Sequence, residues 1–171
     1  LIGDVVKRGQ VLMDPFDVFD SGRMTIAVDP AGAAFGVWQA GTHIGAQLRR
    51  EPGTMNWSEC QTNDPAAARA FYEQVFGWTT SDMGAEYGGY RIFNQNETGI
   101  AGFMTLTEDY IPSHWYPYVA VDDTDATIAK ATDLGGSMIV GPMDVPKVGR
   151  IGILRDPQGA TLLQILDVLV Q

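Results

Sequence analysis

The chain has 171 residues, of which 45% are apolar and 19% are charged, a composition that fits neither a disordered nor a membrane-embedded protein. This length suits one well-packed domain with an appendage, or two small domains. Twenty-one Asp and Glu against eleven Lys and Arg give a net charge of −10, whereas nucleic acids and anionic membranes are bound by basic surfaces. We therefore expect no nucleic-acid partner and no membrane partner.

The chain contains one cysteine, Cys60, and two histidines, His43 and His114. A lone cysteine cannot form an internal disulfide, which fits a reducing compartment, so we expect a cytoplasmic location. Two histidines leave little scope for metal binding or acid–base chemistry by imidazole.

The first forty residues contain a sequence motif that occurs again near the end of the chain. GRMTIAVDPAGA at 22–33 is matched by GRIGILRDPQGA at 149–160, 127 positions later, and the same shift pairs Gly9 with Gly136 without a gap. Similarity at one fixed shift indicates an internal duplication, that is, a tandem repeat. Residues 9–40 should therefore form three strands in the same order as residues 136–167.

Residues 41–53 contain glycines, a basic pair and Glu51-Pro52-Gly53, which is the composition of turns and linkers. At the same shift, the partner of Trp57 would precede Leu1. We therefore predict three parts: the C-terminal remnant of a first βαβββ-type module at 1–40, a linker at 41–53, and a complete second module of two βαβββ units at 54–171.

The second module begins with a strand-like stretch at 55–62, and Asp64 with Pro65 then signals the start of a helix that Gly77 ends. Two tracts at 87–95 and 99–106 indicate a hairpin. The pattern then repeats in outline, with the following elements: a strand at 115–121, a helix at 122–134, and three short strands, the last two joined by a turn at 156–159.

Two βαβββ units predict an α+β fold in which a curved mixed sheet surrounds a cleft and the helices cover its outer face. Successive side chains of a strand point to opposite faces. This alternation assigns two sets of side chains to the cleft: Trp57, Glu59 and Gln61 from the first strand of the module, and His114, Tyr116, Tyr118 and Ala120 from the fifth.

The order of these motifs is characteristic as a whole. A strand, an Asp-Pro cap, AFYEQVFGW, LGG, GR and DPQGA follow one another over residues 54–171, which resembles the vicinal oxygen chelate superfamily of glyoxalase I, bleomycin-resistance proteins and extradiol dioxygenases. The chain is most similar to the tandem-module branch of that superfamily, often labelled as glyoxalases or hydroxylases, whose W-x-E-x-x-T-x-D opening matches Trp57 to Asp64. The resemblance implies the same fold for the second module.

Metal-using members of this superfamily hold a divalent ion through His, Glu or Gln side chains, and the ion acts as a Lewis acid. The resemblance places these ligand positions at Trp57, Tyr116 and Leu163, and at Gly36 in the first module. None of the four is an ordinary metal ligand. We therefore expect neither a metal nor another cofactor.

These features favour a metal-free protein that binds an apolar or aromatic small molecule through Trp57, Glu59, Met104, His114, Tyr116, Tyr118 and Leu163. Alternatively, the protein is a glyoxalase-, hydroxylase- or dioxygenase-like enzyme, with a divalent metal held by other residues or with Glu59 as general base. In a third interpretation the aromatic side chains only fill the space between the sheets.

Two further expectations concern packing. Three strands without the rest of their module would leave Phe35, Val37 and Trp38 without partners, so we expect them to pack in a homodimer or against a missing first-module segment. Arg23 and Arg150 recur beside a glycine, and we assign them a structural role in which they hold a turn through backbone carbonyl groups.

Overall fold

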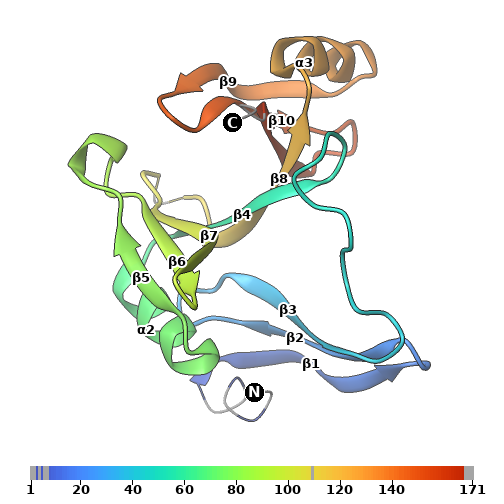
Figure 1. Ribbon diagram of the computed structural model, residues 1–171, viewed down its shortest axis with the longest axis vertical. Helices are drawn as coiled ribbons and strands as arrows, with labels where there is room; N and C mark the ends of the chain where they lie inside the picture. Colours follow the sequence, from blue (N-terminus) through green and yellow to red (C-terminus); the bar gives the residue numbers. More distant parts are fainter. Residues whose placement is uncertain (1–2, 4, 6–7, 109, 168–171) are drawn as a thin grey trace. The chain divides into compact units, whose positions relative to one another are not determined.

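The computed structural model describes residues 3, 5, 8–108 and 110–167, without the side chains of residues 162–167 (Figure 1). The chain forms two compact units. Unit 1 comprises Leu1–Gln47 and Glu59–Trp115, and unit 2 comprises Leu48–Ser58 and Tyr116–Gln171. Both contain strands and helices, which confirms the α+β class, and their strands form the mixed sheets predicted from the sequence.

Unit 1 begins with an antiparallel sheet of three strands in the order β1-β2-β3. The strands are β1 (Gln10–Val18), β2 (Gly22–Val28) and β3 (Ala34–Ala40). A turn at Asp29 joins β2 to β3, and Gly32 in this turn has a positive φ of 95° that favours glycine.

The second part of unit 1 is a β-α-β-β-β stretch with strand order β5-β6-β7-β4. Its elements are β4 (Met55–Thr62, of which unit 1 takes the part from Glu59), α2 (Pro65–Phe76), β5 (Thr79–Asp82), a short 3₁₀ turn η1 (Ala85–Tyr87), β6 (Arg91–Gln95) and β7 (Thr98–Thr105). Asp64 accepts a hydrogen bond from the Ala67 amide at the start of α2, and Gly77 ends the helix with φ of 71°. Both predicted helix signals are confirmed.

The core of unit 1 is an aromatic cluster that joins its two sheets through α2. Tyr72 and Phe71 are almost fully buried, and Phe35 of β3 lies edge-on to both, with ring centroids 5.7 and 5.8 Å away. Val37 belongs to the same buried cluster. The expectation that Phe35 and Val37 lack partners within this chain is therefore wrong, because α2 presents apolar side chains to both sheets.

Trp38 is the third of those residues and lies on the other face of β3. Its indole nitrogen donates to the His43 carbonyl over 3.0 Å, and the two rings are in edge contact. Trp38 is therefore also engaged within unit 1.

Unit 2 contains the strand order β8-β11-β10-β9, with β8 and β11 parallel. Its elements are β8 (His114–Val121, which unit 2 takes from Tyr116), α3 (Thr124–Asp133), β9 (Ser137–Val145), β10 (Gly149–Arg155) and β11 (Thr161–Asp167). Ile128 of α3 packs on Leu154 of β10. Gly152 permits this approach, because a Cβ there would lie 2.7 Å from the Ile128 side chain.

The three strands at each end of the chain correspond in detail. Strands β9, β10 and β11 begin and end 127 positions after β1, β2 and β3. Gly9 and Gly136 occupy matching close approaches, since a Cβ would lie 2.5 Å from the Val28 carbonyl oxygen in one and 3.0 Å from the Arg155 oxygen in the other. These matches support the duplication, while the module boundaries at 1–40, 41–53 and 54–171 stay a prediction.

The two repeated arginines differ in their partners. Arg23 donates to the Pro15 carbonyl and to Asp17, as predicted in part, whereas Arg150 binds the carboxylates of Asp125 and Asp144. For Arg150 the predicted carbonyl contact is replaced by ion pairs that join α3 to the β9–β10 hairpin.

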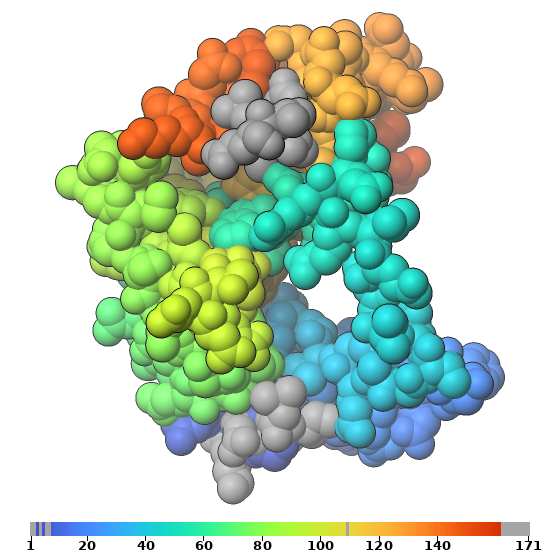
Figure 2. Space-filling view, in the orientation of Figure 1, coloured from blue at the N-terminus to red at the C-terminus, as the bar shows by residue number. Residues whose placement is uncertain are grey.

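The segment 41–53 is almost entirely exposed and runs along the surface (Figure 2). Within the described residues, no helix is long and apolar enough to cross a membrane.

Candidate functional site

The two faces of β4 carry different chemistry, as its alternation predicts. Glu59 and Gln61 lie on one face, where Gln61 Nε2 donates to Glu59 Oε1 over 2.8 Å and contacts Met104 Sδ at 3.9 Å. Met104 is the register partner of Gln61 in the parallel strand β7. Glu59 is only 2% exposed, so unit 1 holds a buried carboxyl group beside an amide and a thioether.

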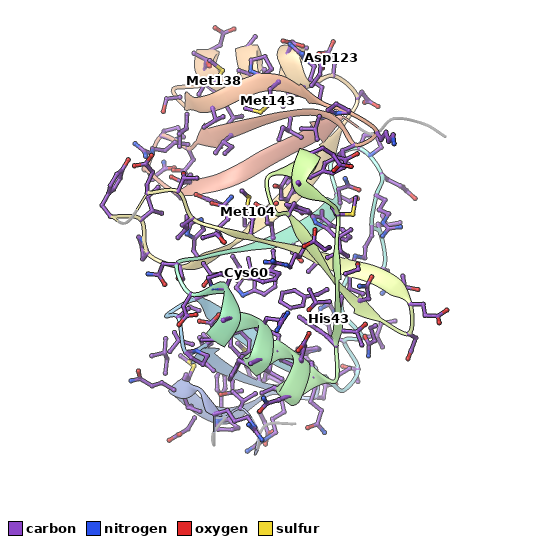
Figure 3. All side chains as sticks on the ribbon, turned by 90° about the vertical axis from the view of Figure 1, so that its left-hand side faces the viewer. His43, Cys60, Met104, Asp123, Met138 and Met143 are labelled. Carbon is purple, nitrogen blue, oxygen red and sulfur yellow. The ribbon has the colours of Figure 1, made fainter. Side chains whose placement is uncertain are left out.

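The opposite face of β4 meets α2 and is closed. Cys60 is fully buried in the aromatic cluster beside α2 (Figure 3). Burial is the main cause that raises the pKa of the Cys60 thiol, and the nearby carboxylates of Asp29 and Glu59 raise it further. Cys60 therefore stays a neutral thiol and is unsuited to nucleophilic chemistry.

A buried hydrogen-bond chain crosses the same cluster. Trp115 Nε1 donates to Tyr72 Oη over 2.8 Å, and Tyr72 Oη donates to Asp29 Oδ2 over 3.0 Å. Asp29 Oδ1 accepts the amides of Ala31 and Ala33. Burial is the main cause that raises the pKa of Tyr72, so its hydroxyl keeps the proton that it shares with Asp29.

His114 lies at the start of β8, within unit 1. Its Nδ1 is 2.6 Å from the carbonyl oxygen of Pro112, two residues earlier. This contact holds the ring against its own segment.

The remaining predicted site residues belong to unit 2. Trp57 and Tyr116 are half-buried, and Tyr118 is 7% exposed. Leu163 stands opposite Leu154 in the β10–β11 ladder, but its side chain falls outside the described part of the chain. Their assignment to a ligand site stays a prediction, as does that of His114 and Met104.

The residues of this chain do not fit the metal site of the family. Trp57, Tyr116, Leu163 and Gly36 stand at the implied ligand positions, and the neighbouring pair Glu59 and Gln61 is joined by its own hydrogen bond. Across the described residues, no three His, Cys, Asp or Glu side chains converge to hold a metal ion. A divalent ion needs several such donors at once.

Unit 2 also contains a shallow depression of about 480 Å³ at the start of α3. It is lined by backbone and side chains around Gly53, Val121 and Lys130, and by Asp123, whose carboxylate already accepts the Ala126 amide as the helix cap. It shares no residue with the predicted ligand site, and three of its lining residues, Asp122, Asp123 and Lys130, are charged.

A family model supports the expected superfamily. Residues 45–163 match the Glyoxalase/Bleomycin resistance protein/Dioxygenase superfamily, and the chain belongs to this family. This confirms the resemblance found in the sequence.

Relatives and solved structures agree with this membership. The chain is 49% identical over 153 residues to a Mycobacterium bovis protein named "Putative glyoxylase CFP32", and 40% identical over 153 residues to "Anthracycline biosynthesis protein DnrV" of Streptomyces peucetius. Each match covers 89% of this chain but only 59% and 55% of the relative, so the chain spans little more than half their length.

The fold is similar to that of the 2,3-dioxygenase LapB from Pseudomonas sp. KL28, with a TM-score of 0.61 and 11% identity over 98% of this chain and 65% of LapB. Methylmalonyl-CoA epimerase from Mycobacterium tuberculosis gives a TM-score of 0.50 and 13% identity over 68% of this chain and 88% of the epimerase. At these identities the likeness concerns the fold alone.

The sequence places Gln61 on the same face of β4 as Glu59, as the structure shows, but Gln61 was left out of the predicted ligand-binding residues. Its hydrogen bond to Glu59 could have been anticipated from their spacing of two residues in a strand. The chain Trp115–Tyr72–Asp29 was missed entirely, since its members are 43 residues apart in sequence and no local pattern joins them.

Proposed function

We propose that this protein binds an apolar or aromatic small molecule without a metal, on the sheet face that carries Glu59, Gln61 and Met104. The observation that supports this function best is the Glu59–Gln61 hydrogen bond beside the Met104 thioether. A few oriented polar groups next to apolar side chains are the usual composition of a small-molecule site.

One relative is named for anthracycline biosynthesis, which supports an aromatic ligand, whereas another carries the name of a glyoxylase, which supports the enzyme described below. The predicted site residues Trp57, Tyr116 and Tyr118 belong to unit 2, and their part in ligand binding stays a prediction from the sequence. Cytoplasmic action without a nucleic-acid or membrane partner, and assembly as a homodimer, remain part of this proposal.

Calorimetric titration of the purified full chain with 2-naphthol, together with its metal content, tests the proposal. We expect saturable binding that a chelator does not change. The variant Met104→Ala should weaken binding by about 1–3 kcal/mol, the contribution of one apolar side chain. Tyr110→Ala serves as the control, since Tyr110 is 81% exposed and outside the predicted site. Absence of binding would contradict the proposal. Binding that is lost when a chelator removes a stoichiometric metal would contradict it too.

A second candidate is an enzyme of the glyoxalase or dioxygenase type in which Glu59 acts as general base. The 2% exposure of the Glu59 carboxyl group favours it, because catalytic carboxyl groups are often buried. Turnover of a dicarbonyl or phenolic substrate that is lost in Glu59→Gln, with substrate binding retained, would establish this function over simple binding.

A further inference from the structure

The orientation of the Gln61 side chain is determined by its neighbours. A carboxylate oxygen accepts hydrogen bonds, so the contact with Glu59 Oε1 requires the NH₂ group of Gln61 on that side. The same nitrogen faces Met104 Sδ at 3.9 Å, and a thioether is also only an acceptor. Both hydrogens of the amide thus point to protein acceptors.

This arrangement leaves the carbonyl oxygen Oε1 as the group that Gln61 can offer a ligand. Gln61 is half-buried, whereas Glu59 behind it is almost fully buried. A ligand on this face would therefore meet a hydrogen-bond acceptor backed by a carboxyl group. A ligand group that donates a hydrogen bond is complementary to this acceptor, whereas a carboxylate, which only accepts, is not.

We propose that Gln61 contacts the ligand and selects molecules that carry a hydroxyl, phenol or ammonium donor over carboxylates and over molecules without a donor. Glu59 is its positioning residue, since it holds the amide in the orientation that turns Oε1 outward. This inference rests on the proposed function, because it concerns the ligand of the same site.

Three naphthalenes of similar size test the selectivity in calorimetric titrations of the full chain: 2-naphthol, 2-methoxynaphthalene and 2-naphthoate. We expect 2-naphthol to bind roughly tenfold more tightly than 2-methoxynaphthalene, since one hydrogen bond is at stake, and 2-naphthoate to bind most weakly. Equal affinities for the three would overturn the inference and leave the proposed function intact. Failure of all three to bind would instead contradict the proposed function.

Two variants assign the selectivity to named residues. Gln61→Met should bring the naphthol-to-methoxynaphthalene affinity ratio close to one, and Gln95→Met, the same change at an exposed position of β6, should leave it at tenfold. Glu59→Gln should lower the ratio, because the amide at position 59 no longer fixes the orientation of the Gln61 amide. For the same reason, 2-naphthoate should bind less weakly relative to 2-naphthol. A ratio unchanged in folded Gln61→Met would contradict the assignment, and the wild-type ligand series remains decisive if that variant does not fold.

Discussion

The sheets β1–β3 and β9–β11 are built alike and are used differently. In both, the aspartate of the turn accepts two backbone amides on one oxygen: Ala31 and Ala33 on Asp29, and Gln158 and Ala160 on Asp156. The second oxygen of Asp29 accepts from Tyr72 and is buried, whereas Asp156 is half-exposed. Among the described residues, no side chain donates to Asp156. The turn at Asp156 is thus held by its own backbone amides, whereas the turn at Asp29 also makes a tertiary contact with α2.

The helices explain this difference. Helix α2 buries Ala68, Phe71, Tyr72 and Val75 and is covered by apolar groups from both sheets of unit 1. Helix α3 buries only Thr124 and Ile128. What a duplicated sheet contributes therefore depends on the aromatic content of the helix that packs on it, and β1–β3 adds the ring of Phe35 where the other copy has Leu162.

Removing the turn aspartate should give the largest difference in stability between the two copies of the sheet. Asp29→Ala leaves two amides and the Tyr72 hydroxyl without their acceptor in a buried site, which we expect to cost about 3 kcal/mol of unfolding free energy. Asp156→Ala should cost about 1 kcal/mol, since water can replace the carboxylate at its exposed turn. Urea unfolding followed by circular dichroism measures both, and equal losses would contradict the comparison.

The second-largest loss of unfolding free energy should come from removing the aromatic contact between β3 and α2. Phe35→Ala should lower the unfolding free energy by about 2–3 kcal/mol, because three rings of α2 lose their edge contact. Phe16→Ala in β1 is the control, with an expected loss of about 0.5 kcal/mol, as its side chain is 39% exposed. A Phe35 variant as stable as the control would show that the sheet is held by other contacts.

The hydroxyl of Tyr72 should have a smaller effect. Tyr72→Phe keeps the ring but leaves Asp29 Oδ2 without its donor and the Trp115 indole without its acceptor, for a loss of about 1–2 kcal/mol. Tyr110→Phe should change nothing measurable by chemical denaturation. If Tyr72→Phe were equally silent, the hydrogen-bond chain would not contribute to the packing of β1–β3.

The smallest effect concerns the repeated arginines. Two hydrogen bonds from Arg150 lower the pKa of the Asp125 carboxyl, so its ion pair stabilises the fold above the ordinary aspartate range and is lost as the pH falls through the lowered value. In Arg150→Gln the pKa of Asp125 should rise to its ordinary value, measured by carboxyl NMR. Arg23→Gln should leave it unchanged, and a shift there would contradict the assignment of Asp125 to Arg150 alone.

Local signals made most of the fold predictable. Asp64 and Gly77 delimit α2 as expected, because a helix cap and a left-handed glycine act within a few residues. The turn at Asp156 was predictable for the same reason, since Gly159 donates its amide back to the Asp156 carbonyl. The repeat extended these predictions to residues 9–40.

Long-range contacts were not accessible in this way. Phe35 was expected to need another chain, because nothing near β3 in sequence indicates that α2, thirty residues later, has an aromatic face left for it. In the candidate site, strand alternation identified Glu59 and Gln61, but their hydrogen bond and the contact with Met104 depend on side-chain conformation and on the pairing of β4 with β7.

The burial of Cys60 means that thiol labelling can report the local opening of unit 1. Cys60 is the only thiol in the chain and is fully buried in the core beside α2, so a thiol reagent can modify the protein only after unit 1 opens locally. The raised pKa of the thiol removes the reactive thiolate from the closed form. The rate of labelling at neutral pH therefore counts openings of unit 1 and does not register those of unit 2.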